Sequence, residues 1–192
     1  MFNSKNQLIV ITGSTGSGKT TLAKLISKHY KIELISLDTI KEQTCDTYGF
    51  LNPFEKQLLA DTAKHIFKAK LISKMRKGKS IVIEYPFNNS WQEFFNKVTN
   101  QYKYELIVVN CTSRDFDNIW EDKIARDKSE SRHKSHLANK YIKWSRCEID
   151  NTLFSDDYKA LEQEKYTNNY YTSIIGDKIL TDVEVRQLLR QE

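Results

Sequence analysis

The sequence predicts an α/β fold built on a parallel β-sheet that helices cover on both faces. Short apolar runs rich in Ile, Val and Leu alternate with longer stretches in which apolar residues recur at helical spacing. The runs are apolar almost throughout, as in strands that are buried on both faces. Only 6 Gly and 2 Pro among 192 residues exclude a loop-rich sandwich or a collagen-like rod. We expect a single domain over residues 1–192.

The apolar runs and the stretches between them give the order of the elements. Strands are expected at 8–12, 32–36, 80–84 and 104–110. Helices are expected at 19–29, 54–76, 90–100, 115–128 and 137–148. A fifth strand near 171–175 and a last helix near 181–190 complete the alternation.

The residues after the first strand form the most specific motif of the sequence. Glycines in such a loop let backbone N–H groups converge on phosphate oxygens, and the following helix adds the positive end of its dipole. Lys19 is expected to neutralise the β and γ phosphates, and Thr20 to supply an oxygen to Mg²⁺. The motif, which matches the phosphate-loop pattern G-x-x-x-x-G-K-[ST], reads Gly13-Ser14-Thr15-Gly16-Ser17-Gly18-Lys19-Thr20.

Acidic residues follow the second and third strands. Ligands of open α/β sheets bind outside the carboxyl ends of the strands, so Asp38 and Glu84 are expected beside the phosphate loop. Glu84 can hold a magnesium-bound water or act as a base towards a hydroxyl. Asp38 can accept the proton of an attacking hydroxyl, and it also fits the N-cap of a helix. Which of the two carboxylates is the base stays open.

A basic segment, residues 122–148, carries most of the net charge. It holds eight Lys and Arg against four Asp and Glu, whereas the whole chain has a formal charge of +5. Ser129, Ser131 and Ser135 interrupt it, which predicts a loop between two helices. Guanidinium groups on such a segment can stabilise a phosphoryl group in transfer, so Arg126 and Arg132 are expected to act in a lid.

The cysteines and the hydropathy favour a reduced cytoplasmic protein. Cys45, Cys111 and Cys147 are widely spaced, odd in number and form no Cys-x-x-Cys pair. The sequence starts without the long apolar stretch of a signal peptide, and no run approaches the ~18 apolar residues of a membrane span. We therefore expect no membrane partner.

These motifs together resemble the P-loop small kinases of the nucleotide-kinase-like class. The resemblance is to predicted AAA-domain kinases, which are also similar to polynucleotide kinases, zeta toxins and chloramphenicol phosphotransferases. It implies a five-stranded parallel sheet of order 2-3-1-4-5, ATP as the phosphoryl donor, Asp38 as the base and arginines in a helical lid. The segments that carry it are 13–20, Asp38 with Lys41-Glu42, 83–87, and Arg126 with Arg132-His133.

The leading hypothesis is an ATP- and Mg²⁺-dependent kinase that phosphorylates a hydroxyl of a small-molecule or nucleotide-like acceptor. Its expected catalytic residues are Lys19, Asp38, Arg126 and Arg132, and its expected metal ligands are Thr20 and Glu84. The identity of the acceptor and the roles of His133 and His136 stay open.

Two other functions are compatible with the same motifs. One is a polynucleotide 5′-hydroxyl kinase, in which Tyr48, Phe50 and Phe54 would stack on bases. The other is an NTP-dependent switch or regulatory ATP-binding module with slow hydrolysis. A GTPase is disfavoured because the guanine-reading Asn-Lys-x-Asp motif is missing.

Overall fold

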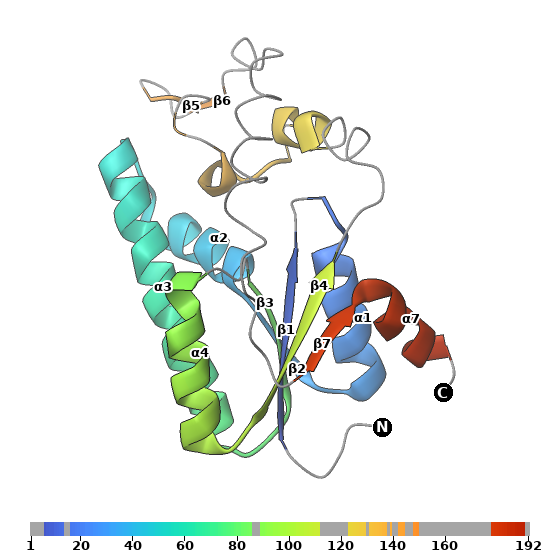
Figure 1. The fold of residues 1–192 in the computed structure, drawn as a ribbon. Helices are drawn as coiled ribbons and strands as arrows, with labels where there is room; N and C mark the ends of the chain where they lie inside the picture. Colours follow the sequence, from blue (N-terminus) through green and yellow to red (C-terminus); the bar gives the residue numbers. More distant parts are fainter. Residues whose placement is uncertain are drawn as a thin grey trace.

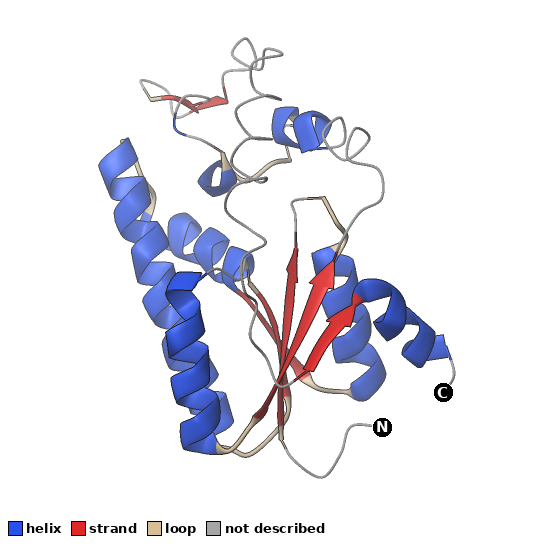
Figure 2. Ribbon diagram, viewed as in Figure 1, coloured by secondary structure: helices blue, strands red, loops and turns tan. Residues whose placement is uncertain are grey.

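A parallel β-sheet between two layers of helices forms the body of the protein, which confirms the predicted α/β class (Figures 1 and 2). The computed structural model describes residues 6–13, 16–85, 89–111, 123–129, 131–137, 139, 142–144, 148–149 and 178–190. The sheet runs in the order β2-β3-β1-β4-β7. Its strands are β1 (Gln7–Gly13), β2 (Glu33–Ser36), β3 (Ile81–Glu84), β4 (Glu105–Cys111) and β7 (Lys178–Thr181). All four neighbouring pairs are parallel.

The strand order is the one that the family resemblance implies, with β7 in the place of the fifth strand. The range 171–175, where that strand was expected, lies outside the described residues. The helices around the sheet are α1 (Lys19–Tyr30), α2 (Leu37–Tyr48), α3 (Pro53–Met75), α4 (Asn89–Tyr102) and α7 (Asp182–Arg190). Of the helix expected at 115–128, residues 123–128 are helical and the rest is not described.

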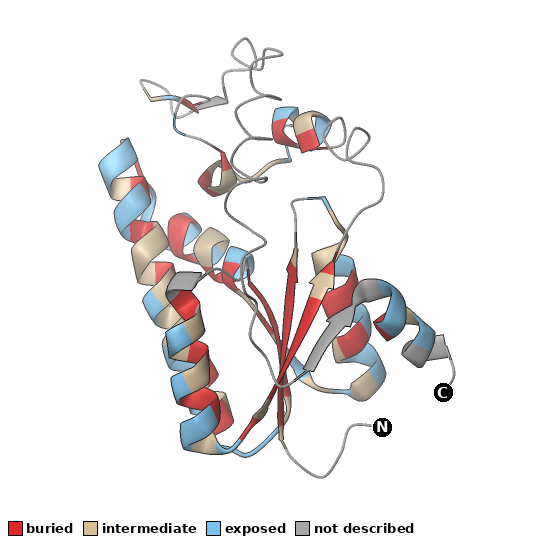
Figure 3. Ribbon diagram, in the orientation of Figure 1, coloured by how far each residue is buried: buried red, intermediate tan, exposed pale blue. Residues whose placement is uncertain are grey.

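Two hydrophobic layers hold the helices on the sheet, because successive side chains of a strand point to opposite faces. Leu8 and Val10 of β1 pack into one layer with residues of α3 and α4. Ile9 and Ile11 pack into the other layer with α1 and with Val185 of α7 (Figures 1 and 3). This burial on both sides explains why the strands could be recognised from nearly continuous apolar runs.

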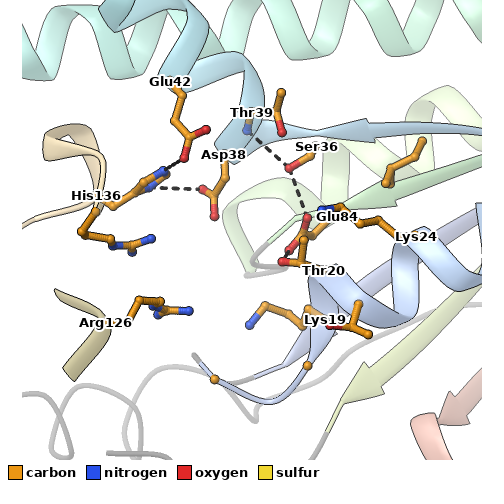
Figure 4. A pocket seen from close by; sticks show the side chains of 15 residues that line it. Lys19, Thr20, Lys24, Ser36, Asp38, Thr39, Glu42, Glu84, Arg126 and His136 are labelled. Carbon is orange, nitrogen blue, oxygen red and sulfur yellow. Dashed lines mark hydrogen bonds and ion pairs between the residues drawn. The ribbon is translucent and has the colours of Figure 1, made fainter. Parts of the chain in front are cut away.

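Helix α2 was expected only as a possible turn after Asp38, and the structure extends it over three turns. Ser36 is its N-cap, and the Ser36 hydroxyl accepts a hydrogen bond from the Thr39 N–H at 3.4 Å. Asp38 therefore is not the N-cap, which corrects one of its two expected roles. It is the second residue of the helix, and its side chain points away from the helix towards the mouth of the sheet (Figure 4).

The predicted helix at 137–148 is wrong. The structure has a short 3-10 helix η1 (Lys134–His136), followed by two antiparallel strands, β5 (Ile142–Lys143) and β6 (Glu148–Ile149). Tertiary packing decides this conformation: Leu137 and Ile142 are buried in a third cluster with residues of α2 and α3 and the loop between them. Side-chain burial of this kind overrides the weak helix propensity of a short segment.

A buried lysine also joins the basic segment to α3. The Lys56 ammonium group donates hydrogen bonds to the backbone carbonyl of Leu137 and, at 3.1 Å, to Oδ1 of Asn139. Leu137, Asn139 and Ile142 of the basic segment are thus packed against α2 and α3. Among the helices in the described ranges, none has the length and apolar character needed to cross a bilayer.

Candidate active site

A cavity of about 580 Å³ opens at the carboxyl end of the sheet, where the phosphate loop meets α2 and the basic segment (Figure 4). It brings together all six expected catalytic and metal-binding side chains: Lys19, Thr20, Asp38, Glu84, Arg126 and Arg132. Gly16 and Gly18 of the loop also line it. Gly13 and Ser17 do not, and Ser14 and Thr15 lie outside the described residues.

The glycines of the loop take backbone conformations that other residues rarely adopt. Gly16 and Gly18 have φ angles of 80° and 81°, and Gly18 is the N-cap from which α1 begins. Gly13, with φ of 131°, lies opposite Cys111 of β4. A Cβ atom on Gly13 would come within 2.1 Å of the Cys111 carbonyl oxygen. The start of the loop therefore requires glycine for steric reasons.

Gly13→Ala should lower the free energy of unfolding by at least about 3 kcal/mol, because the β1 and β4 backbones would have to separate. Gly49→Ala is a matched control, since Gly49 also has a positive φ, of 68°, but has nothing within 4 Å of an added Cβ. The control should cost less, about 2 kcal/mol, from backbone strain alone. Urea denaturation measures both, and equal losses would contradict the steric argument.

Lys19 and Arg126 point into the cavity from opposite sides (Figure 4). Burial lowers the pKa of Lys19, and the nearby carboxylates of Glu84 and Asp38 offset part of that effect. A cation that has lost much of its water interacts strongly with a phosphate brought into the same space. Lys19 is thus placed where an anionic ligand would stabilise its charged form.

Glu84 is buried at the end of β3, and both of its carboxylate oxygens accept hydrogen bonds from hydroxyl groups. Thr20 Oγ1 donates to Oε1, and Ser36 Oγ donates to Oε2 at 3.2 Å (Figure 4). Ser36 was not among the predicted site residues, although its position at the end of β2 matches that of Glu84 on β3. Hard oxygen atoms from one carboxylate and its neighbours suit Mg²⁺, which keeps several waters and uses few protein ligands. The residues present therefore fit that ion.

Asp38 and Glu42, one turn apart on α2, both approach His136 of η1 (Figure 4). His136 Nε2 lies 2.7 Å from Glu42 Oε1, and Nδ1 lies 3.8 Å from Asp38 Oδ1. The His136 side chain is only 6% exposed, whereas that of Asp38 is 63% exposed. Burial lowers the pKa of His136, with Asp38 acting in the opposite direction. In the neutral ring the proton belongs on Nε2, because Glu42 lies within hydrogen-bond distance of Nε2 whereas Asp38 lies too far from Nδ1 to accept from it.

The buried carboxylate of Asp127 holds Arg132 in place. Asp127 binds Arg132 Nε through Oδ1 at 3.0 Å and Lys123 Nζ through Oδ2 at 2.8 Å. The Asp127 and Lys123 side chains are both buried. Charge-assisted hydrogen bonds of this type fix side-chain orientation, so Arg132 reaches the cavity from a supported position. This role of Asp127 could not be predicted from the sequence, where it is one of four acidic residues in a segment with eight Lys and Arg.

Residues 8–146 match the model of a protein family described as AAA domain. The chain belongs to this family. The matched range contains the phosphate loop, all six of the side chains above, strands β2, β3 and β4, and β1 from its second residue on. No curated protein matches the sequence significantly.

Solved structures similar to this AAA-domain protein include small P-loop kinases. A candidate kinase from Chloroflexus aurantiacus has a TM-score of 0.74 at 20% identity, with 98% of each chain covered. The APS kinase of Mycobacterium tuberculosis, solved with AMPPNP and APS, has a TM-score of 0.51 at 15% identity, covering 99% of this chain and 100% of that one. The PezAT toxin-antitoxin structure from Streptococcus pneumoniae has a TM-score of 0.52 at 14% identity, covering 98% and 86%. At identities this low, the structural similarity shows that the chain has the P-loop kinase fold and nothing more specific.

A second cavity of the AAA-domain protein, of about 430 Å³, lies between the end of α2 and the basic segment. Arg132 lines both cavities. Of the aromatic residues expected to stack on bases, Phe50 is largely buried in the third hydrophobic cluster and also lines this cavity. Tyr48 and Phe54 are 72% and 77% exposed beside the loop that forms one wall of this cavity.

Proposed function

We propose that this AAA-domain protein is a kinase that uses ATP and Mg²⁺ to phosphorylate a hydroxyl of a small-molecule or nucleotide-like acceptor. The observation that supports this best is that one cavity joins the phosphate loop, a solvent-accessible carboxylate at Asp38 and two arginines. A protein that only hydrolyses ATP needs a positioned water but no space for an acceptor between base and phosphate loop.

In the proposed reaction the acceptor oxygen bonds to the γ-phosphorus of ATP as the bond from that phosphorus to the β–γ bridging oxygen breaks. Asp38 takes the proton of the acceptor hydroxyl, and ADP leaves with the negative charge. Lys19 and the loop N–H groups hold the β and γ phosphates, while Arg126 and Arg132 face the charge that spreads over the equatorial oxygens. Thr20 and Glu84 would hold Mg²⁺, which neutralises phosphate charge when bound.

His136 acts in this scheme as a positioning residue for Asp38. Glu42 fixes the imidazole ring through Nε2, so that Nδ1 faces the proposed base and can accept a hydrogen bond from it once Asp38 is protonated. The charged side chains that face His136 from the packed elements are Asp38, Glu42 and Lys41 of α2 and Arg132 of the basic segment.

The lowered pKa of His136 predicts a loss of stability in mild acid. Below pH 6.5 the unfolded chain binds a proton at His136 that the folded protein does not, so the free energy of unfolding decreases as the pH falls towards the folded pKa. The slope from one group is at most about 1.4 kcal/mol per pH unit. His136→Gln should flatten this part of the profile, measured by urea denaturation between pH 7.5 and 5, whereas His65→Gln at an exposed position of α3 should not. Identical profiles for both variants would contradict the assignment.

The proposed activity is tested by incubating the purified chain with ATP, Mg²⁺ and acceptors of several classes. Nucleosides, sugars, aminoglycosides and 5′-hydroxyl oligonucleotides represent four classes of hydroxyl-bearing acceptor. ADP formation should rise well above its basal rate with at least one class of acceptor. Hydrolysis at full rate without any acceptor would favour the switch instead.

Exposed aromatics favour a polynucleotide 5′-hydroxyl kinase as a second candidate function. Tyr48 and Phe54 are exposed and flank the loop whose Gly49 and Phe50 line the second cavity together with Arg132 and Lys134. If the 5′ end of a nucleic acid strand lay at Asp38, these cations could contact its phosphates and these aromatic rings could stack on its bases. Phosphorylation of a 5′-hydroxyl oligonucleotide should then weaken steeply between 50 and 200 mM salt. A rate insensitive to salt, or no reaction, would exclude this candidate.

A further inference from the structure

The topology collects positive charge at the amino end of the sheet, opposite the phosphate loop (Figure 1). In a parallel sheet the turns that lead into the strands all lie at the same edge. Lys31 lies in the turn before β2, Lys77 and Lys79 in the turn before β3, and Lys103 in the turn before β4. Two of these turns lead into the neighbouring strands β2 and β3 and therefore place their cations close together.

Lysine side chains from two of these turns line a cavity of about 510 Å³. Its charged residues are Lys31, Glu33, Lys74, Lys77 and Lys79, so one carboxylate faces four ammonium groups. That carboxylate is already engaged, because Glu33 Oε2 lies 2.6 Å from Lys74 Nζ. Within the described part of the chain, no hydrogen bond or ion pair engages the ammonium groups of Lys31, Lys77 and Lys79.

Helix dipoles account for only part of this positive charge. The negative end of a helix stabilises cations within its last turn, which explains Lys74 in α3. Lys31 is the C-cap of α1 and is stabilised in the same way, whereas Lys77 and Lys79 lie beyond Arg76, the C-cap of α3. Gathered around one cavity, these cations repel one another, and an anion placed among them would relieve that repulsion.

The surroundings of the cavity indicate what kind of anion it suits. Of the large hydrophobic side chains that are exposed in the described residues, none lies in the turns before β2, β3 and β4. This edge therefore offers neither apolar groups to insert into a membrane nor rings to stack on bases. Lysines are point charges suited to phosphate groups rather than to base recognition.

We propose that this basal cavity binds the phosphodiester backbone of single-stranded nucleic acid without regard to base sequence. In this proposal the ammonium groups of Lys31, Lys77 and Lys79, which line the cavity, neutralise phosphates of the strand. The site is separate from the candidate active site, because the two lie at opposite ends of the sheet. It therefore adds a nucleic-acid contact whatever acceptor the enzyme phosphorylates.

The test compares two double variants that remove the same charge. Lys77→Gln with Lys79→Gln removes half of the lysines of the cavity, whereas Lys70→Gln with Lys97→Gln removes exposed lysines from the middle of α3 and from α4. Binding of a fluorescent 12-nucleotide oligo(dT) is followed by anisotropy at 50 to 200 mM salt. The first pair should weaken binding by roughly tenfold at 100 mM salt and make the salt slope shallower by about 1.4. The control pair should change the affinity less than about twofold, since isolated surface charges contribute little.

Thermal midpoints and basal ATP hydrolysis of both double variants should match those of the wild type, because neither pair touches the proposed catalytic residues. Equal losses of oligonucleotide binding in the two pairs would overturn the proposal. So would wild-type protein that binds phosphatidylserine vesicles but no oligonucleotide, or binding that Lys77→Gln with Lys79→Gln leaves unchanged.

Discussion

Lys19→Met should lower the rate of phosphoryl transfer by about 10³-fold or more, the largest effect that we expect from one substitution. The side chain lies in the cavity behind the phosphate loop, where burial already lowers its pKa. Its charge is therefore poorly screened and interacts strongly with the β and γ phosphates. Methionine fills a similar volume without the charge, so the loop should keep its shape.

Lys28→Met is the matched control for this substitution. Lys28 is an exposed lysine in the last turn of the same helix and does not line the cavity. Its replacement should leave kcat/KM for ATP within about twofold of the wild type. Titration of ATP against both variants separates binding from turnover. A Lys19→Met enzyme that kept more than a tenth of the wild-type rate would remove this lysine from the mechanism.

Asp38→Asn should reduce kcat by roughly 10² to 10⁴-fold while the affinity for ATP stays nearly constant. The asparagine side chain has the same shape as aspartate but cannot take the proton of an acceptor hydroxyl. The loss should appear only in acceptor phosphorylation, since Asp38 lies on α2 and not in the phosphate loop. Initial rates at saturating ATP, together with ATP binding by calorimetry, measure the two effects separately.

Asp46→Asn distinguishes a chemical role of Asp38 from a structural one. Asp46 lies two turns further along α2 and also pairs with the basic segment, with Oδ1 3.0 Å from His133 Nε2. If Asp38 only tied α2 to that segment, both substitutions would have similar effects. A chemical role predicts that Asp46→Asn keeps kcat within a few-fold of the wild type. An Asp38→Asn enzyme with unchanged turnover would contradict the proposed base.

The parts of the structure that follow from local rules could be predicted from the sequence. The strands were recognisable because burial on both faces makes them apolar throughout, as in Val82 and Ile83 of β3. The phosphate loop was recognisable because its glycines occupy conformations that few other residues tolerate. Asp38 and Glu84 could be placed at the same mouth because parallel strands end at one edge.

Contacts between distant segments could not be predicted in this way. The pairing of His136 with Glu42 joins residues 94 positions apart, and nothing in their local sequence predicts it. The hairpin after Leu137 forms because Ile142 is buried against α2 and α3, a contact that helical periodicity does not reveal. Ser36 was missed for a related reason: its partner Glu84 comes from another strand. The identity of the acceptor could not be predicted either. Phosphate binding uses a backbone loop with a recognisable motif, whereas an acceptor is recognised by ordinary side chains that follow no fixed pattern.

The fate of the γ-phosphate tests the central claim most directly. The chain is incubated with γ-³²P-labelled ATP, Mg²⁺ and each class of acceptor, and the labelled products are separated by chromatography. If the chain is a kinase, the label moves into an organic phosphate with at least one acceptor, and Asp38→Asn abolishes this product. If it is not, the label appears only as inorganic phosphate, at the same rate with and without every acceptor.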